Sequence, residues 1–275
     1  MPWIESVMNG GNETEKCVDS ETSTPFSSTP VSATNDTRCG LQGGKPLVNI
    51  GNEAYNGQFP WMVRITVTFW NRQNQTCLGT LIADQWVVTN ANCVNFSNFH
   101  FASLDFGRFD LSKTTEQENG MRMTSTEIYS HPCFHGWDFD LALVKLPKKI
   151  NISRNIRPIC LPENCDSSVD DFEFEIDSCR LAEIVGWEST KGQLFDHLPI
   201  VGNLTVIPRY ICNQHFTRNL NQSQICAYGS SWQYEGAAPV MCKNNWNNTI
   251  YLLGITSIGN PNRQKRTVFS RSIFF

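Results

Sequence analysis

From residue 47 onward, apolar residues occur in short runs that are separated by turn-forming residues. The segment "MVRITVTF" (62–69) alternates apolar and polar residues, which is the period of a half-buried strand. Four further runs are short and apolar: "GTLIADQWVVT" (79–89), "FDLALVKL" (139–146), "AEIVGWE" (182–188) and "IYLLGITSIG" (250–259). No run sustains a 3.6-residue period, and no internal repeat is present. The pattern predicts an all-β domain built as a sandwich or a pair of barrels.

The segment before this domain has a different composition. Residues 18–38, "VDSETSTPFSSTPVSATNDTR", are rich in Ser, Thr and Pro and cannot bury enough apolar surface to offset their ordering entropy. We interpret them as a plain linker, in preference to an O-glycosylated stalk. Cys17 precedes the linker and Cys39 closes it. The chain therefore divides into an N-terminal segment with linker, 1–38, and a β domain over 39–275.

Length and charge narrow the function classes. The chain has 275 residues, of which 40% are hydrophobic and 17% charged, enough for a sizeable core. The net charge is −4, and the short basic cluster at 263–266 is predicted to be a solvated loop, so a nucleic-acid partner is not expected. No run approaches 18 apolar residues, so no membrane span or membrane partner is expected.

Cysteines and glycosylation motifs indicate the compartment. Eleven cysteines stand against five histidines, and no C-x-x-C pair suggests zinc, so disulfides in an oxidising compartment are favoured. Residues 1–16 lack the basic start and apolar core of a signal peptide, so no leader is visible in this chain. Eight N-x-Ser/Thr sequons strengthen the prediction of a secreted, extracellular glycoprotein: Asn12, Asn35, Asn74, Asn95, Asn151, Asn203, Asn221 and Asn247.

A possible metal motif has a plainer interpretation. His131 and His135 flank Cys133 as H-x-C-x-H, which could hold a metal ion. A surface loop is the favoured interpretation, so neither a metal nor a cofactor is predicted.

Six motifs, in this order, resemble landmarks of the chymotrypsin-like serine proteases over residues 39–271. They are "GQFPWMVRI" (57–65), "CLGTLIADQWVVTNANC" (77–93), "DFDLALVKL" (138–146), "RPICLP" (157–162), "VGWEST" (185–190) and "QYEGAAPVMC" (233–242). The resemblance implies two six-stranded antiparallel β-barrels. It is strongest to the non-catalytic homologues of the insect clip-domain type.

The resemblance also implies where the catalytic triad would stand. That triad needs an attacking hydroxyl, an imidazole to carry its proton and a carboxylate to orient the imidazole. The imidazole position is Asn92 and the nucleophile position is Gly236, so only the carboxylate, Asp140, remains. An amide is no base near neutral pH and glycine has no side chain. We expect Asp140 to serve as a buried hydrogen-bond acceptor.

The residues around the triad positions also differ from the family pattern, at the oxyanion position and at the activation site. Tyr234 stands at the oxyanion position, where glycine permits the required turn easily. Glu235 replaces the aspartate that binds a newly released N-terminus. That N-terminus would be Asn49, but Val48 precedes it instead of Arg or Lys. We therefore expect no activation by tryptic cleavage.

The specificity pocket has changed as well. Its floor maps to Ser230, its rim to Ile258 and Gly259, and its bracing disulfide to Trp232 and the loop after Gly259. Neither side of that disulfide has a cysteine. The chain also ends in "VFSRSIFF", where the family continues into a closing helix. The groove under that helix should be partly exposed, or filled by Ile273, Phe274 and Phe275.

The disulfide frame implied by the family is largely kept. The implied pairs are Cys39–Cys160, Cys77–Cys93, Cys179–Cys242 and Cys212–Cys226, with Cys133–Cys165 as a possible lineage-specific addition. Cys17 is then the odd cysteine, which could pair with another module or another chain.

These features predict a secreted protease homologue without catalysis. The resemblance implies a cofactor, decoy or adaptor in an extracellular protease cascade of immunity, clotting or development, with other cascade proteins as partners. Two alternatives remain open: an active serine-type endopeptidase with a displaced catalytic apparatus, and a product with no selected function.

Overall fold

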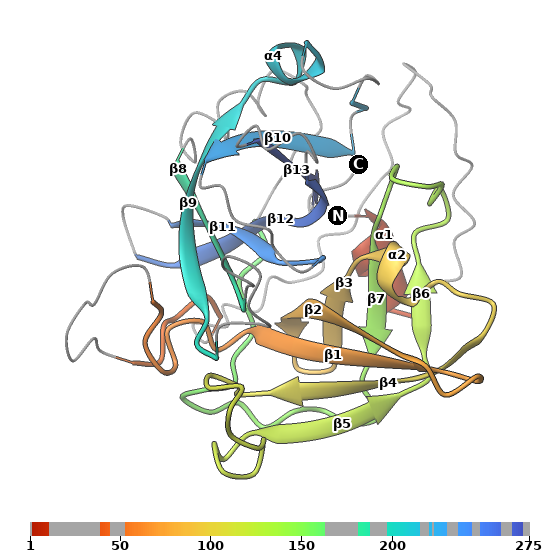
Figure 1. Ribbon diagram of the computed structural model, residues 1–275, viewed down its shortest axis with the longest axis vertical. Helices are drawn as coiled ribbons and strands as arrows, with labels where there is room; N and C mark the ends of the chain where they lie inside the picture. Colours follow the sequence, from red (N-terminus) through yellow and green to blue (C-terminus); the bar gives the residue numbers. More distant parts are fainter. Residues whose placement is uncertain are drawn as a thin grey trace.

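A computed structural model describes residues 2–10, 39–44, 53–162, 181–187, 197–214, 220–221, 223–229, 236–243, 248–259 and 266–271. Two curled antiparallel β-sheets, one from each half of the chain, lie against each other (Figure 1). The helices are short: α1 (Pro2–Met8), α2 (Ala91–Val94) and α4 (Arg209–Asn213). None of the helices described is long and apolar enough to span a membrane.

The first sheet has strand order β5-β4-β1-β2-β3-β7-β6. Its strands are β1 (Met62–Phe69), β2 (Asn74–Ala83), β3 (Trp86–Thr89), β4 (Phe99–Phe106), β5 (Met121–Ser125), β6 (Ile128–Ser130) and β7 (Ala142–Lys145). The apolar residues of β1 alternate inward along most of its length, as the sequence predicts. The single run expected at 79–89 instead forms the end of β2, a turn at 84–85, and β3.

The sequence led us to expect six strands in this half, and the structure has seven. The additional strand arises where the chain bends between β5 and β6. There the Ser125 hydroxyl donates to the Lys145 carbonyl at 2.5 Å and accepts from the Glu127 N–H at 3.1 Å. These bonds end β5, which pairs with β4, and let β6 pair with β7 at the opposite edge. One bent segment thus joins the two edges of the sheet.

The second half closes into a six-stranded barrel of order β10-β13-β12-β11-β8-β9. Its strands are β8 (Leu181–Gly186), β9 (Ile200–Ile207), β10 (Gln224–Gly229), β11 (Pro239–Lys243), β12 (Ile250–Gly259) and β13 (Arg266–Arg271). The all-β, two-sheet prediction is therefore confirmed.

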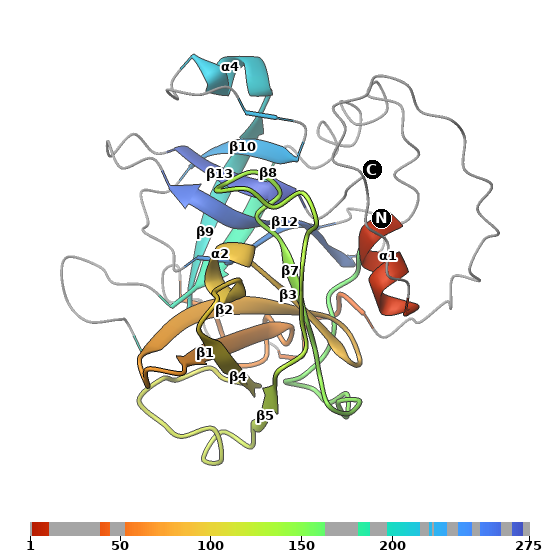
Figure 2. The same cartoon turned by 90° about the vertical axis from the view of Figure 1, so that its right-hand side faces the viewer.

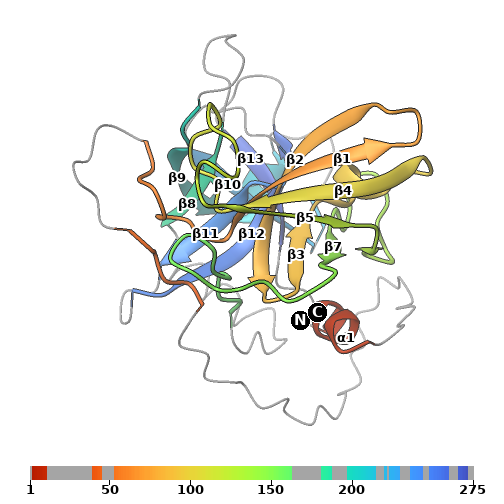
Figure 3. The same ribbon diagram turned by 90° about the horizontal axis from the view of Figure 1, so that it is seen from below.

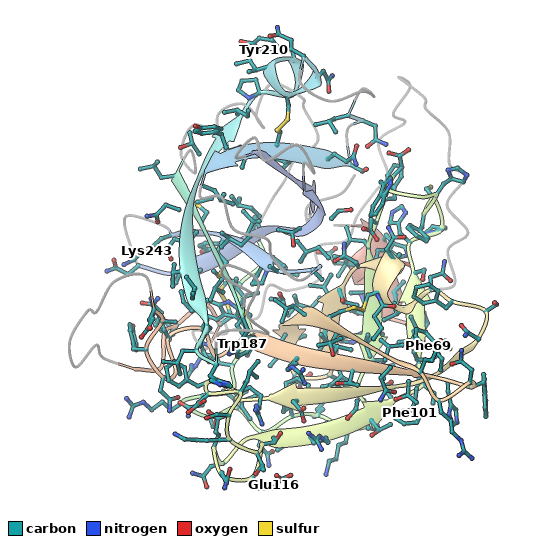
Figure 4. All side chains as sticks on the ribbon, viewed as in Figure 1. Phe69, Phe101, Glu116, Trp187, Tyr210 and Lys243 are labelled. Atoms are coloured by element: carbon teal, nitrogen blue, oxygen red, sulfur yellow. A yellow bond between two sulfur atoms is a disulfide. The ribbon has the colours of Figure 1, made fainter. Side chains whose placement is uncertain are left out.

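Two tryptophans join the halves at the core. Trp61 and Trp187 are fully buried. The Trp187 indole N–H donates to the Phe109 carbonyl of the first half at 2.9 Å, and Trp187 lies where the halves meet (Figure 4). The Trp61 indole contacts the Met241 sulfur of β11 at 3.1 Å. Each indole thus buries a large apolar ring and satisfies its polar N–H across the junction.

Three of the disulfides implied by the resemblance are present: Cys39–Cys160, Cys77–Cys93 and Cys212–Cys226. They close separations of 121, 16 and 14 residues. Cys133 and Cys242 are disulfide-bonded as well. Their expected partners, Cys165 and Cys179, lie outside the described residues, as does Cys17.

A buried ion pair organises the loop between β4 and β5. Arg108 Nε lies 3.2 Å from Glu118 Oε2, and both side chains are under 10% exposed, at 7% and 6%. The other Glu118 oxygen accepts the N–H groups of Phe109 and Asp110 at 3.1 and 2.6 Å. The Arg108 guanidinium also donates to the Lys113 carbonyl at 2.7 Å. Each charge is thus paired and hydrogen-bonded, which a buried ion pair requires.

Helix α1 packs on the first sheet. In Figures 1, 2 and 3 it lies beside β7. Trp3 and Ile4 are 3% and 2% exposed and belong to the same core as the strands. The apolar groove expected at this domain was to be partly exposed or filled by 273–275. Those residues lie outside the described set, whereas α1 covers the apolar surface that is described beside β7.

Trp3 rests on a histidine for which the sequence suggested a surface position. His131 is 4% exposed, so that interpretation is wrong for this residue, although it holds for the exposed His135. The His131 ring stacks on Phe139, with centroids 4.7 Å apart, and contacts Trp3 at 4.9 Å. Burial between these rings lowers the pKa of His131 from 6.5 to about 4.

The burial of the Arg108–Glu118 pair predicts that breaking it costs much more stability than breaking an ion pair at the surface. Arg108→Ala should lower the free energy of unfolding by about 3–5 kcal/mol, because it leaves a carboxylate buried without its charge partner. Lys149→Ala is the matched control, since Lys149 pairs with Asp84 at 2.8 Å with side chains 74% and 40% exposed. It should cost under about 1 kcal/mol. Urea denaturation of both variants tests this, and equal losses would contradict it.

The depressed pKa of His131 predicts that the folded protein loses stability as the pH falls. Between pH 6.5 and about 4 the unfolded chain binds a proton that the folded chain excludes. This contribution to stability is complete above pH 6.5 and is lost as the pH falls, by on the order of 3 kcal/mol at pH 4. His131→Gln removes the titration, so its pH profile of unfolding should be flatter over that range. Parallel profiles for the two proteins would contradict the assignment.

Candidate functional site

The register of two paired strands assembles the site. β3 and β7 pair so that Thr89 lies opposite Ala142. Asn90 directly follows β3, and Asp140 lies two residues before β7, so the pairing brings these side chains together. The Cys77–Cys93 disulfide ties α2, which follows Asn90, to β2.

Asp140 is the centre of the site. It is fully buried, and its carboxylate accepts three hydrogen bonds. Oδ1 accepts the backbone N–H of Asn92 at 2.8 Å, and Oδ2 accepts the Asn90 amide at 2.8 Å and the Ser257 hydroxyl at 2.5 Å. Ser257 belongs to β12, so the carboxylate also joins the two halves of the fold. The structure thus makes Asp140 the buried acceptor that the sequence analysis expected.

Asn90 is the site residue that the sequence analysis missed. It holds the N-cap position of α2, with φ −74° and ψ 141°, yet its side chain makes no cap bond. Its Nδ2 donates to Asp140 instead, while its Oδ1 is buried and has no hydrogen-bond partner among the described residues. A Cβ built on Gly236 would lie 3.9 Å from that Oδ1. The Asn90 amide therefore lies between the Asp140 carboxylate and Gly236, the expected nucleophile position.

Asn92 points elsewhere. Its side-chain Nδ2 donates to the Gly136 carbonyl at 2.6 Å, in the loop between β6 and β7. Only its backbone N–H reaches Asp140. Asn92, the expected imidazole position, therefore braces this loop, and Asn90 takes the side-chain contact with Asp140.

The segment after the nucleophile position is held from both halves. The Gly236 carbonyl accepts the Leu78 N–H at 3.1 Å. Ala237 and Thr256 are joined by a backbone bond of 3.0 Å, and Ala238 donates to the Thr256 hydroxyl at 2.9 Å. Ala237 has φ 71°, a left-handed conformation that glycine adopts more easily. The turn therefore has a shape that glycine would adopt with less strain.

These contacts limit the chemistry of the site. Of the roughly four acceptor positions of a carboxylate, three on Asp140 are occupied. The side chains that donate to Asp140 are the Asn90 amide and the Ser257 hydroxyl, and neither group takes up a proton near neutral pH. Among the described residues no three His, Cys, Asp or Glu side chains gather as a metal site. The described site can therefore bind through hydrogen bonds, and it offers no proton-carrying partner to Asp140.

Other predicted site residues lie outside the described residues: Ser230, Trp232, Tyr234 and Glu235. Ile258 and Gly259 are in β12, where their backbones pair with Val268 and Thr267 of β13. Their roles as pocket rim stay predictions.

The predicted glycosylation sites fall into three groups. Asn74, Asn95, Asn151 and Asn203 are exposed. Asn221 is half-buried, and its side-chain oxygen accepts the N–H and hydroxyl of Ser223 at 2.9 and 2.5 Å. Asn12, Asn35 and Asn247 lie outside the described residues. Four sequons thus present an accessible amide for modification.

Comparison with known proteins decides the family. The family profile described as "Trypsin" matches residues 48–274. The chain belongs to the trypsin family. A solved structure described as "Structure of GrC" has a TM-score of 0.66 at 21% identity, covering 80% of this chain and 92% of that one. This likeness confirms the trypsin-like fold.

The curated relatives of this trypsin-family chain are distant. Melanization protease 1 of Drosophila melanogaster is 27% identical, over 80% of this chain and 60% of that protein. Ovochymase of Halocynthia roretzi is 27% identical, over 85% of this chain and 14% of that protein. Venom serine protease of Polistes dominula is 25% identical, over 81% of this chain and 79% of that protein. The chain thus spans less than two thirds of the first two relatives.

The described surroundings of Gly236 predict tolerance of a side chain at this position. Gly236→Ala should change the free energy of unfolding by no more than about 0.5 kcal/mol, because among the described residues only Asn90 Oδ1 lies within 4 Å of the added carbon. Gly236→Ser should be the more stable of the two variants, because its hydroxyl can reach that unpaired oxygen.

Gly43→Ala is the matched control for these variants. Its added carbon would lie 1.8 Å from the Arg154 carbonyl oxygen, so the backbone must move, at about 2 kcal/mol or more. Urea unfolding midpoints measure all three. A loss of stability in Gly236→Ala as large as that in Gly43→Ala would contradict the geometry.

Proposed function

We propose that this protein is a secreted, non-catalytic member of the trypsin family that acts as a cofactor, decoy or adaptor in an extracellular protease cascade. The observation that best supports this proposal is the hydrogen bond from the Asn90 amide to Asp140. A catalytic triad needs an imidazole as the partner of that carboxylate. Gly236 offers no hydroxyl, and the Asn92 side chain is engaged with Gly136. Removal of a single triad member from such enzymes already costs about 10⁴–10⁶ in rate.

The scaffold supports a binding role. The two halves remain joined by Asp140, Trp61 and Trp187, and three described disulfides brace them. Disulfides and exposed sequons are typical of secreted proteins. Among the relatives, the name of Melanization protease 1 indicates a protease of melanization. A role beside such proteases, with binding in place of cleavage, is the function we infer.

The first test is chemical labelling. The secreted protein should hydrolyse no peptide amide and should form no adduct with a serine-directed fluorophosphonate, because residue 236 carries no hydroxyl. A catalytically active trypsin-family protease, treated in parallel, is the positive control. Mass spectrometry of the labelled digest decides the result. An adduct within residues 223–243, or turnover of a substrate panel, would establish an active enzyme with a displaced apparatus.

The second test restores the triad. In Asn92→His/Gly236→Ser, the new imidazole must compete with the Asn90 amide for Asp140 Oδ2. We expect turnover at least 100-fold below that of an active family member, because small misplacements of catalytic groups cost about that factor. Adding Asn90→Ala, which removes the competing amide, should raise the rate. Full activity of the double variant, or no gain in the triple variant, would show that Asn90 does not control the site.

A further inference from the structure

Helix α1 is too short to be stable by itself. It has seven residues, and isolated helices below about 12–15 residues are marginal in water. The face that carries Trp3 and Ile4 is nearly fully buried, while Glu5 on the same helix is exposed. Val7 and Met8 are partly buried and pack against the same core. The helix therefore depends on its contacts with the first sheet.

The surface that receives α1 includes the His131 ring, in the loop between β6 and β7, which contacts Trp3 and stacks on Phe139. The His131 backbone N–H donates to the Leu141 carbonyl at 2.8 Å, and its Nδ1 accepts the Cys133 N–H at 3.2 Å. These bonds fix the imidazole with one side toward Trp3 and its face on Phe139. We name this surface, His131 and Phe139 with the adjoining end of β7, the α1 seat.

The α1 seat adjoins the degenerate catalytic site. Phe139 directly precedes Asp140, and its N–H donates to the Ser223 hydroxyl at 3.2 Å. Phe139 has φ 49°, a conformation that a bulky residue adopts only when its surroundings hold it. On the same loop, Gly136 accepts the Asn92 amide. One loop thus contacts α1 on one side and the site residues on the other.

A long stretch of sequence separates α1 from the β domain. Twenty-eight residues, 11–38, separate Gly10 from Cys39, and the composition of 18–38 predicts a linker. A helix tethered in this way meets its seat as an intramolecular ligand, at an effective concentration set by the tether.

We propose that the α1 seat is a separable docking surface for a Trp-Ile amphipathic helix, occupied here by α1 of the same chain. Docking orders the loop 131–140, and the two halves of the protease fold form without it. This inference concerns a different surface from the proposed function and holds whether or not the site is catalytic.

The test uses the full chain in two variants. Trp3→Ala/Ile4→Ser should release α1, and Glu5→Gln, on the exposed side of the same helix, is the matched control. Hydrogen exchange is measured on peptides that cover 128–141 and on peptides that cover β1 and β2. In the first variant we expect exchange over 131–140 to rise at least tenfold with β1 and β2 unchanged, and no rise in Glu5→Gln.

A synthetic peptide of residues 1–10 supplies the second readout. Added to the Trp3→Ala/Ile4→Ser chain, it should restore slow exchange over 131–140, whereas the same peptide with Trp3→Ala should not. Three outcomes would each overturn the proposal: unchanged exchange in the released variant, failure of the peptide to restore protection, or loss of protection throughout β1 and β2. The last would show that α1 is an integral part of the fold and not a ligand of it.

Discussion

The structure depends on one buried charge. The Asp140 carboxylate lies at the junction of the two halves and accepts donors from α2, from Asn90 before it and from Ser257 of the second barrel. A buried carboxylate that loses a donor is strongly destabilising, so these three bonds constrain everything attached to them. They set the position of α2, the approach of β12 to the first sheet, and the loop that leads into β7.

This constraint explains how the scaffold persists in the non-catalytic protein that we propose. Asp140 needs hydrogen-bond donors, and an amide N–H serves as well as an imidazole N–H for that purpose. Catalysis needs in addition a group that takes a proton and passes it on, which an amide cannot do. Asn90 therefore meets the structural requirement of the carboxylate, and its amide is not a group that could meet the catalytic one. The disulfide Cys77–Cys93 and the paired strands β3 and β7 hold this arrangement.

Several of these features could be read from the sequence, and others could not. Alternation over 62–69 predicted β1, and the resemblance placed Asn92, Asp140 and Gly236 and implied three disulfides now seen. The role of Asn90 depends on the register of β3 against β7, and its sole sequence signal is a polar residue within a buried run. The burial of His131 depends on Trp3, some 130 residues earlier in the chain. Such contacts arise from tertiary packing, which local patterns do not encode.

The energetics of Asn90 indicate which requirement dominates at the site. Its Nδ2 satisfies a buried charge, while its Oδ1 stays buried without a partner among the described residues. An unpaired neutral oxygen costs about 1–3 kcal/mol, and a buried charged group deprived of a hydrogen-bond donor costs more than a neutral one. The arrangement accepts the smaller cost to avoid the larger one. Because a hydroxyl at residue 236 could reach that oxygen, the glycine there leaves a stabilising contact unused. The geometry of this centre is therefore set by the need of Asp140 for hydrogen-bond donors, and the Asn90 amide is one of the groups that meet this need.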